Sequence, residues 1–197
     1  LLIGLALGAV AAGTGVYLYQ RSHNAPASGP TNTAGSTLSM ASQGKKDVGA
    51  ALRNVAMTGA VLVVKSGESI QAAVVKAKPG DTIKVMPGVY KETVYIDKDN
   101  IAIVGVIVDG EWPLMDGERK LNDAILYSGS GIRIENMKIT HYKGNGIMGQ
   151  AGNNFVIRYN WIVDTGVYGI FPEFGKNGLI EYNVVSGIED AAIYVGM

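Results

Sequence analysis

The chain reads IENMKITHYKGNGIMGQ at 134–150, IRYNWIVDTGVYGIFPE at 157–173 and IEYNVVSGIEDAAIYVG at 180–196. These three segments superimpose without gaps when the sequence is shifted on itself by 23 residues. A period of 23 is too short for a pair of helices, and each copy holds three short β-rich runs separated by Gly, Asn or Asp. The repeat therefore predicts that each copy forms one triangular coil of three short strands.

Three positions of the repeat stay aliphatic in every copy. Stacked coils place equivalent residues about 4.8 Å apart, the spacing of hydrogen-bonded strands, so that each aliphatic position becomes a continuous column. We expect these columns to form the core of a parallel β-helix. They consist of Ile134, Ile157 and Ile180; of Ile139, Ile162 and Val185; and of Ile147, Ile170 and Ile193.

Two polar positions support the same stacking. Glu135, Arg158 and Glu181 align with alternating charge, which stacked parallel strands favour. Asn160 and Asn183 align at a turn, as an asparagine ladder requires. The simplest interpretation of both columns is structural.

The segment from Ser66 to Met197 resembles the right-handed parallel β-helix repeat family of the pectin-lyase-like superfamily. The resemblance rests on the repeat and on SGESIQAAVVKAKPGDTIKVMPGVY, which is similar to the family's first coil, where a short helix plugs the N-terminal end. It implies an all-β, right-handed, single-stranded parallel β-helix over 59–197, with a capping helix after Ser69 and a C-terminus truncated in mid-coil. It does not imply one activity, because this coil carries lyases, glycosidases, epimerases and binding proteins.

Two segments precede the predicted solenoid. Residues 1–20 carry no charge and reach the roughly 20 apolar residues that cross a bilayer, which predicts a transmembrane anchor or a signal segment. Residues 21–58 are a low-complexity linker rich in Ser, Asn, Ala and Pro, with a possible short helix in KKDVGAALRNVAM. We therefore expect a membrane-anchored or exported protein, periplasmic or on the cell surface.

Composition excludes some functions. The 17 Lys plus Arg balance 17 Asp plus Glu, so no strong positive field favours nucleic acid as a partner. The absence of cysteine excludes thiolate metal sites and cysteine nucleophiles. The histidines, His23 and His141, are far apart in sequence and predict no metal site; calcium, which lyases often use, has no residue pattern in its favour, and we expect no cofactor.

The repeat is interrupted between Val108 and Ala124 by DGEWPLMDGERKLND, which is too polar for a core strand. We expect this stretch to be a loop that projects from one corner of the coil. Trp112 within it is either a platform for stacking a sugar ring or a cover over the coil's own apolar surface.

The outward side of one predicted strand is unusually apolar. Because Ile147, Ile170 and Ile193 face inward, alternation turns Met148, Phe171 and Tyr194 outward. Aromatic rings flanked by carboxylates suit a polysaccharide, so we predict that a polysaccharide or another cell-envelope component binds along this face. The predicted binding residues are Trp112, Tyr168, Phe171, Tyr194 and Arg158.

An alternative is a carbohydrate-active enzyme, either a polysaccharide lyase, an epimerase or a glycosidase. Its carboxylates would be Glu173, Asp190 and Asp164, or Glu189. The stretch YGIFPE at 168–173 matches the Tyr, Gly and Pro of the YG-x-DPH motif found in epimerases and lyases of this fold, but it lacks the Asp and the His. A third possibility is a purely structural surface solenoid without a ligand.

Overall fold

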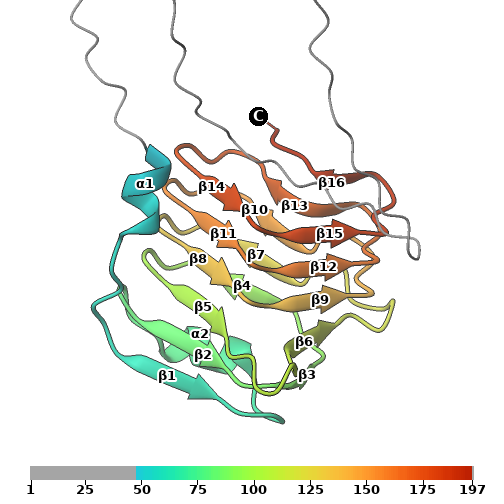
Figure 1. Ribbon diagram of the computed structural model, residues 1–197, viewed down its shortest axis with the longest axis horizontal. Coiled ribbons are helices and arrows are strands. Elements are labelled where there is room, and N and C mark those ends of the chain that lie inside the picture. Colours follow the sequence, from blue (N-terminus) through green and yellow to red (C-terminus); the bar gives the residue numbers. More distant parts are fainter. Residues whose placement is uncertain (1–47, 197) are drawn as a thin grey trace, which may run out of the picture.

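The computed structural model describes residues 48–196, which form a solenoid of stacked coils with two short helices (Figure 1). Three parallel sheets run along the solenoid, and each coil contributes one strand to each sheet. The predicted anchor at 1–20 and most of the predicted linker lie outside the described residues. Within 48–196, no helix is long and apolar enough to cross a membrane.

The strands of each sheet follow one another in coil order, as a solenoid requires. Sheet A contains β1 (Val61–Val64), β2 (Thr82–Val85), β5 (Ala102–Gly105), β8 (Arg133–Glu135), β11 (Val156–Arg158) and β14 (Leu179–Glu181). Sheet B contains β3 (Gly88–Tyr90), β6 (Pro113–Asp116), β9 (Lys138–Thr140), β12 (Trp161–Val163) and β15 (Val184–Ser186). Sheet C contains β4 (Val94–Ile96), β7 (Ile125–Tyr127), β10 (Ile147–Gly149), β13 (Tyr168–Pro172) and β16 (Ala191–Ile193).

The aliphatic columns form the core, which confirms the prediction from the repeat. Ile134 pairs with Ile157 and Ile157 with Ile180, in the predicted register. In the coils that hold Ile134 and Ile157, all the column residues are fully buried. The parallel β-helix is therefore held together by ladders of aliphatic side chains that run along its axis.

The asparagine ladder lies at the sharp turn between sheets A and B. Asn160 is buried; its Oδ1 accepts a hydrogen bond from the Met137 backbone N–H at 3.1 Å, and its Nδ2 donates to the Ile134 carbonyl at 3.0 Å. The same Nδ2 donates to Asn183 Oδ1 at 3.0 Å. Tyr159, which precedes Asn160, has a φ of 59°, so the chain turns through the left-handed region here.

The charged column on the outer side of sheet A is also as predicted. Arg158 Nε lies 2.9 Å from a carboxylate oxygen of Glu135, and its Nη1 lies 3.8 Å from Glu181. Arg133, a member that the repeat did not indicate, adds a contact of 3.0 Å between its Nη1 and Glu135. These ion pairs join neighbouring coils on the outside of the solenoid.

Helix α2 (Ile70–Lys76) closes one end of the core, as expected of a capping helix (Figure 1). Ser69 is its N-cap, because the Ser69 hydroxyl accepts from the Ala72 N–H at 3.1 Å. The Glu92 carboxylate accepts from two more N–H groups of the first turn, and Ile70 and Val74 are buried against the first coil. The exposed end of the coil is thereby covered.

Helix α1 (Val48–Arg53) lies on the outer side of sheet A, beside β8, β11 and β14 (Figure 1). Leu52 is buried in this contact. The Arg133 guanidinium donates to the Leu52 and Val55 carbonyls at 3.0 and 3.1 Å, which satisfies acceptors at and just beyond the end of the helix. The helix is therefore fastened to the coils by backbone contacts as well as by apolar packing.

The prediction of a projecting loop over 109–123 is wrong in its middle. Strand β6 lies there and pairs with β3 and β9, and its Met115 is fully buried. Pro113 and Met115 face the core while Leu114 and Asp116 face outward, so this coil uses alternation within a polar surrounding. Only the flanking stretches, 106–112 and 117–122, connect the strands as loops.

Tyr127 carries the one buried side-chain polar atom between residues 48 and 196 that has no hydrogen-bond partner. Burial raises the pKa of its hydroxyl. Because an unpaired buried hydroxyl is unfavourable, Tyr127→Phe is expected to raise the free energy of unfolding by about 1 kcal/mol, measured by urea denaturation. Tyr142→Phe is the matched control: the Tyr142 hydroxyl donates to the Glu92 carbonyl at 2.6 Å, so its removal is expected to destabilise. A destabilised Tyr127→Phe variant would contradict this assignment.

Candidate functional site

An unbroken column of apolar side chains runs along the outer side of sheet C. The strand registers place its members on successive coils, because Tyr95 pairs with Leu126, Leu126 with Met148, and Met148 with Phe171. Tyr194 follows β16 in the next coil, and its ring lies 5.3 Å from that of Phe171. We call these residues the aromatic strip; they are Tyr95, Leu126, Met148, Phe171 and Tyr194.

Three rings cluster at one end of the strip. Tyr168 lies beside it, with its ring centroid 4.8 Å from Phe171 and 5.1 Å from Tyr194. The Tyr168 and Tyr194 rings are nearly parallel, at 18°. Tyr194 is 46% exposed, and Phe171 and Tyr168 are half-buried. These rings therefore form an accessible platform whose members hold one another in place.

A polar column borders the strip on the side of sheet B. Asn145 donates its backbone N–H and its Nδ2 to Asp123 Oδ1 at 2.8 and 2.7 Å. Asn145 Oδ1 accepts from the Tyr168 N–H at 3.2 Å. Asp123 and Asn145 are buried, so this ladder fixes the backbone from which the Tyr168 ring projects.

A second polar column borders the strip on the side of sheet A. It consists of the residues that directly follow the strands, namely Asp97, Ser128, Gln150 and Glu173. The Ser128 hydroxyl lies 2.9 Å from the Tyr95 hydroxyl, which ties this column to the strip. Asp97 and Gln150 are exposed and Glu173 is half-buried. The apolar strip is therefore flanked by hydrogen-bonding groups on both sides.

Tyr168 has the one perturbed acid–base group on this face. Desolvation raises the pKa of the Tyr168 hydroxyl, and the carboxylate of Asp190, which hydrogen-bonds to it, raises the pKa further. The hydroxyl consequently stays protonated at neutral pH and can act as a hydrogen-bond or proton donor. The structure thus brings together four of the predicted site residues: Tyr168, Phe171, Tyr194 and Asp190, with Glu173 on the opposite border of the strip.

Two of the predicted binding residues lie on other faces. Trp112 packs edge-on against Trp161 of sheet B, with ring centroids 6.0 Å apart, and Lys138 lies 4.2 Å from the Trp161 centroid. Arg158 belongs to the charged column of sheet A. Neither side chain therefore contributes to the aromatic strip.

Asp164 lies in a separate cluster at the corner that follows sheet B. Its carboxylate pairs with Arg119 and lies 3.5 Å from His141 Nε2, while His141 Nδ1 lies 3.0 Å from Asp116. The expectation that His141 is isolated is therefore wrong, because the coil stacks it between two carboxylates far away in sequence. Glu189 is exposed in the next coil.

No three His, Asp or Glu side chains in the part of the chain that the structure describes are arranged to hold a metal ion. The Asp116–His141–Asp164 cluster consists of side chains that already contact one another. The absence of a cofactor stays a prediction from the sequence.

Sequence reasoning missed the first two members of the strip. The spacing from Tyr95 to Leu126 is 31 residues and from Leu126 to Met148 is 22 residues, whereas Met148 and Phe171 are 23 apart. A search at one fixed offset cannot align these coils. The usable signal is the apolar residue between two buried ones in VYI (94–96) and ILY (125–127).

Residues 83–197 match the family profile described as "Right handed beta helix region". This match covers more than half of the chain. The chain belongs to the right-handed β-helix family. A search of curated proteins gave no significant match to this β-helix protein.

Among solved structures, the β-helix protein is similar to an alginate lyase from Paenibacillus sp. str. FPU-7, with a TM-score of 0.55 and 18% sequence identity. The alignment covers 70% of this chain and 50% of the lyase, so the chain spans about half the length of that enzyme. At this identity the similarity establishes the shared fold alone.

Proposed function

We propose that this β-helix protein binds polysaccharide, with the glycan lying along the aromatic strip of sheet C. The observation that carries the proposal is the strip itself: five successive coils each present one apolar or aromatic side chain outward, at the same position. An exposed apolar surface bordered by polar groups is typical of an interaction site.

The chemistry of a sugar chain fits this arrangement. Aromatic rings pack against the apolar faces of sugars, while hydroxyls and amides beside them bond to the sugar hydroxyls. Ser128, Gln150 and Glu173 on one border, and Tyr168 on the other, supply such groups. The repeat of one apolar side chain per coil suits a ligand that is itself a linear repeat.

Two further facts support a role in carbohydrate binding at the cell envelope. The lyase with the same fold acts, by its name, on alginate, which is a polysaccharide. The uncharged segment at 1–20 favours anchoring in a membrane or export across it. Both are consistent with a cell-envelope glycan as the partner.

Phe171→Ala is expected to weaken retention on an immobilised polysaccharide about tenfold, because the ring supplies the centre of the three-ring platform. Tyr194→Ala is expected to have a similar effect. The measurement is affinity electrophoresis or a binding isotherm on a panel of insoluble polymers. Tyr182→Ala is the matched control, because Tyr182 is 63% exposed but stacks on Tyr159 at another corner. Equal losses in Tyr182→Ala and Tyr194→Ala would contradict the proposed face.

A polysaccharide-cleaving activity is a second candidate, favoured by the hydrogen bond between Tyr168 and Asp190 at the edge of the strip. A protonated hydroxyl next to a carboxylate is the kind of pair that general acid–base catalysis uses. Release of new chain ends by the wild type, lost in Asp190→Asn without loss of binding, would establish the enzyme. Binding without turnover leaves the protein a binding module.

A further inference from the structure

The face that holds the aromatic strip is negative. Its bordering columns contribute the carboxylates of Asp97 and Glu173 on one side and Asp123 on the other, and Asp190 lies against Tyr168. None of the residues in the strip or in the two bordering columns is a lysine or an arginine. A ligand on this face therefore meets carboxylates and no opposing charge.

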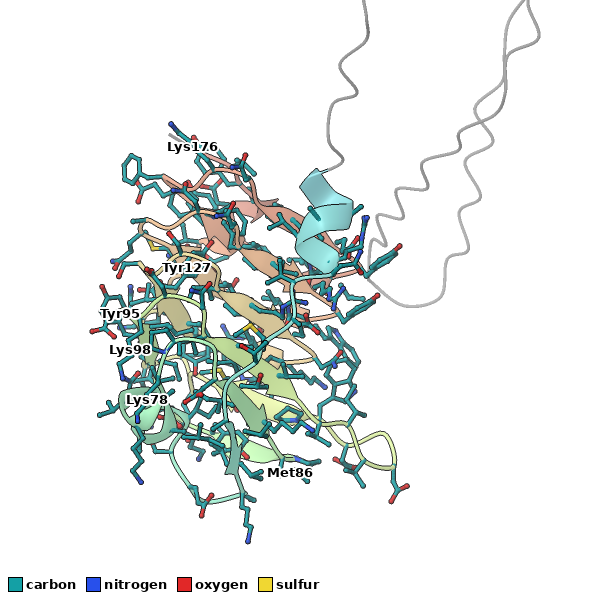
Figure 2. The ribbon with its side chains drawn as sticks, turned by 90° about the vertical axis from the view of Figure 1, so that its left-hand side faces the viewer. Lys78, Met86, Tyr95, Lys98, Tyr127 and Lys176 are labelled. Carbon is teal, nitrogen blue, oxygen red and sulfur yellow. The ribbon has the colours of Figure 1, made fainter. Side chains whose placement is uncertain are left out.

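The cations nearest in sequence do not alter this pattern. Lys98 lies next to Tyr95 (Figure 2), but its ammonium donates to the carbonyls of Val74, Val75 and Ala77 at 2.7 to 3.0 Å. It therefore completes the end of α2 and is not available to a ligand. Lys143 and Lys176 are exposed in the connections between sheets, outside the three columns.

Rings with neighbouring cations occur on other faces. Lys138 lies over Trp161 on sheet B, and the Arg158 guanidinium carbon is 5.4 Å from the centroid of Tyr159 at the turn after sheet A. The solenoid thus contains aromatic residues with and without adjacent cations. Only the latter kind forms the strip.

We propose that the glycan recognised by the strip is neutral, built from uncharged sugars, and not a polyuronate; this rests on the proposed function of the same face. Like charges a few ångströms apart repel, most of all where the surrounding rings exclude water. A uronate carboxylate seated on Phe171 would lie between Glu173 and the Tyr168–Asp190 pair. Neutral hydroxyls can instead donate hydrogen bonds to these carboxylates.

Salt dependence separates neutral from anionic ligands. Binding of a neutral glucan or mannan is expected to be unchanged between about 0.01 M and 1 M salt, where the screening length falls from about 30 Å to about 3 Å. Binding of alginate or polygalacturonate is expected to be at least tenfold weaker at low salt and to improve as salt is added, because salt screens repulsion. Attraction to a cationic site would give the opposite sign.

A charge reversal on the strip provides the second arm. Glu173→Lys is expected to increase the affinity for polygalacturonate about tenfold at low salt, and to reduce the affinity for the neutral glycan through the lost hydrogen-bond acceptor. Glu111→Lys makes the same change of net charge on the exposed loop before β6 and serves as the control. It is expected to change neither affinity.

The outcomes distinguish the two levels of the proposal. Tighter binding of polyuronate than of neutral glycan by the wild type, weakened by salt and lost in Phe171→Ala, would overturn the neutral-ligand inference while supporting the proposed function. Equal gains in Glu173→Lys and Glu111→Lys would also overturn it, because the strip would then have no special role. Failure to retain any polymer would overturn the proposed function itself.

Discussion

Replacing Ile170 by alanine is expected to lower the free energy of unfolding by about 3 to 4 kcal/mol, the range for a large-to-small change in a packed core. Ile170 is fully buried, and it pairs with Ile147 in one neighbouring coil and Ile193 in the other. The lost methyl groups would leave a cavity that the neighbouring coils cannot close without shifting their registers. The measurement is urea denaturation followed by circular dichroism.

Ile193→Ala is the matched control for this prediction. It removes the same atoms from the same column, but Ile193 is 47% exposed, so we expect a loss of about 1 kcal/mol. Equal losses at the two positions would show that the column does not form one packed core. A loss below about 1 kcal/mol in Ile170→Ala would contradict the burial that the structure assigns to it.

Asn160→Ala is expected to destabilise the protein by about 3 kcal/mol. Removal of the amide leaves the Met137 N–H and the Ile134 carbonyl without their side-chain partner in a buried turn, and each unsatisfied buried group is unfavourable by about 1 to 3 kcal/mol. The contact to Asn183 is lost as well. Thermal and urea unfolding of the variant measure the effect.

Asn153→Ala tests the same chemistry on the surface. Asn153 Oδ1 accepts from the Lys176 N–H at 2.9 Å, but the side chain is exposed and water can replace it. Its loss is expected to stay below about 1 kcal/mol. If Asn153→Ala destabilises as strongly as Asn160→Ala, burial of the ladder is not what makes Asn160 important.

The regular coils could be predicted from sequence because their spacing is constant. The columns through Ile134 and Ile157 and the ladder from Asn160 to Asn183 recur at one offset, and parallel pairing converts that offset directly into contacts. Strand β6 could not be predicted in this way. Its inward residues, Pro113 and Met115, are surrounded by polar neighbours, and the coil length changes on either side.

The site was predictable to the same extent. Alternation around Ile170 placed Phe171 on the surface, and the repeat placed Met148 and Tyr194 beside it. The cluster of Asp116, His141 and Asp164 was not predictable, because left-handed turns at His141 and Asp164 bring these side chains together. Turn geometry of this kind has no signature in a single sequence.

The most direct test of glycan binding by the strip uses the methionine methyl groups as reporters in an NMR titration with a neutral oligosaccharide. Met148 lies in the middle of the strip, while Met115 and Met137 are fully buried in the core. We predict a saturable shift of the Met148 methyl signal that disappears in Phe171→Ala, with the signals of Met115 and Met137 unchanged. A Met148 signal that stays in place while the oligosaccharide binds would show that the glycan lies elsewhere and would contradict the proposal.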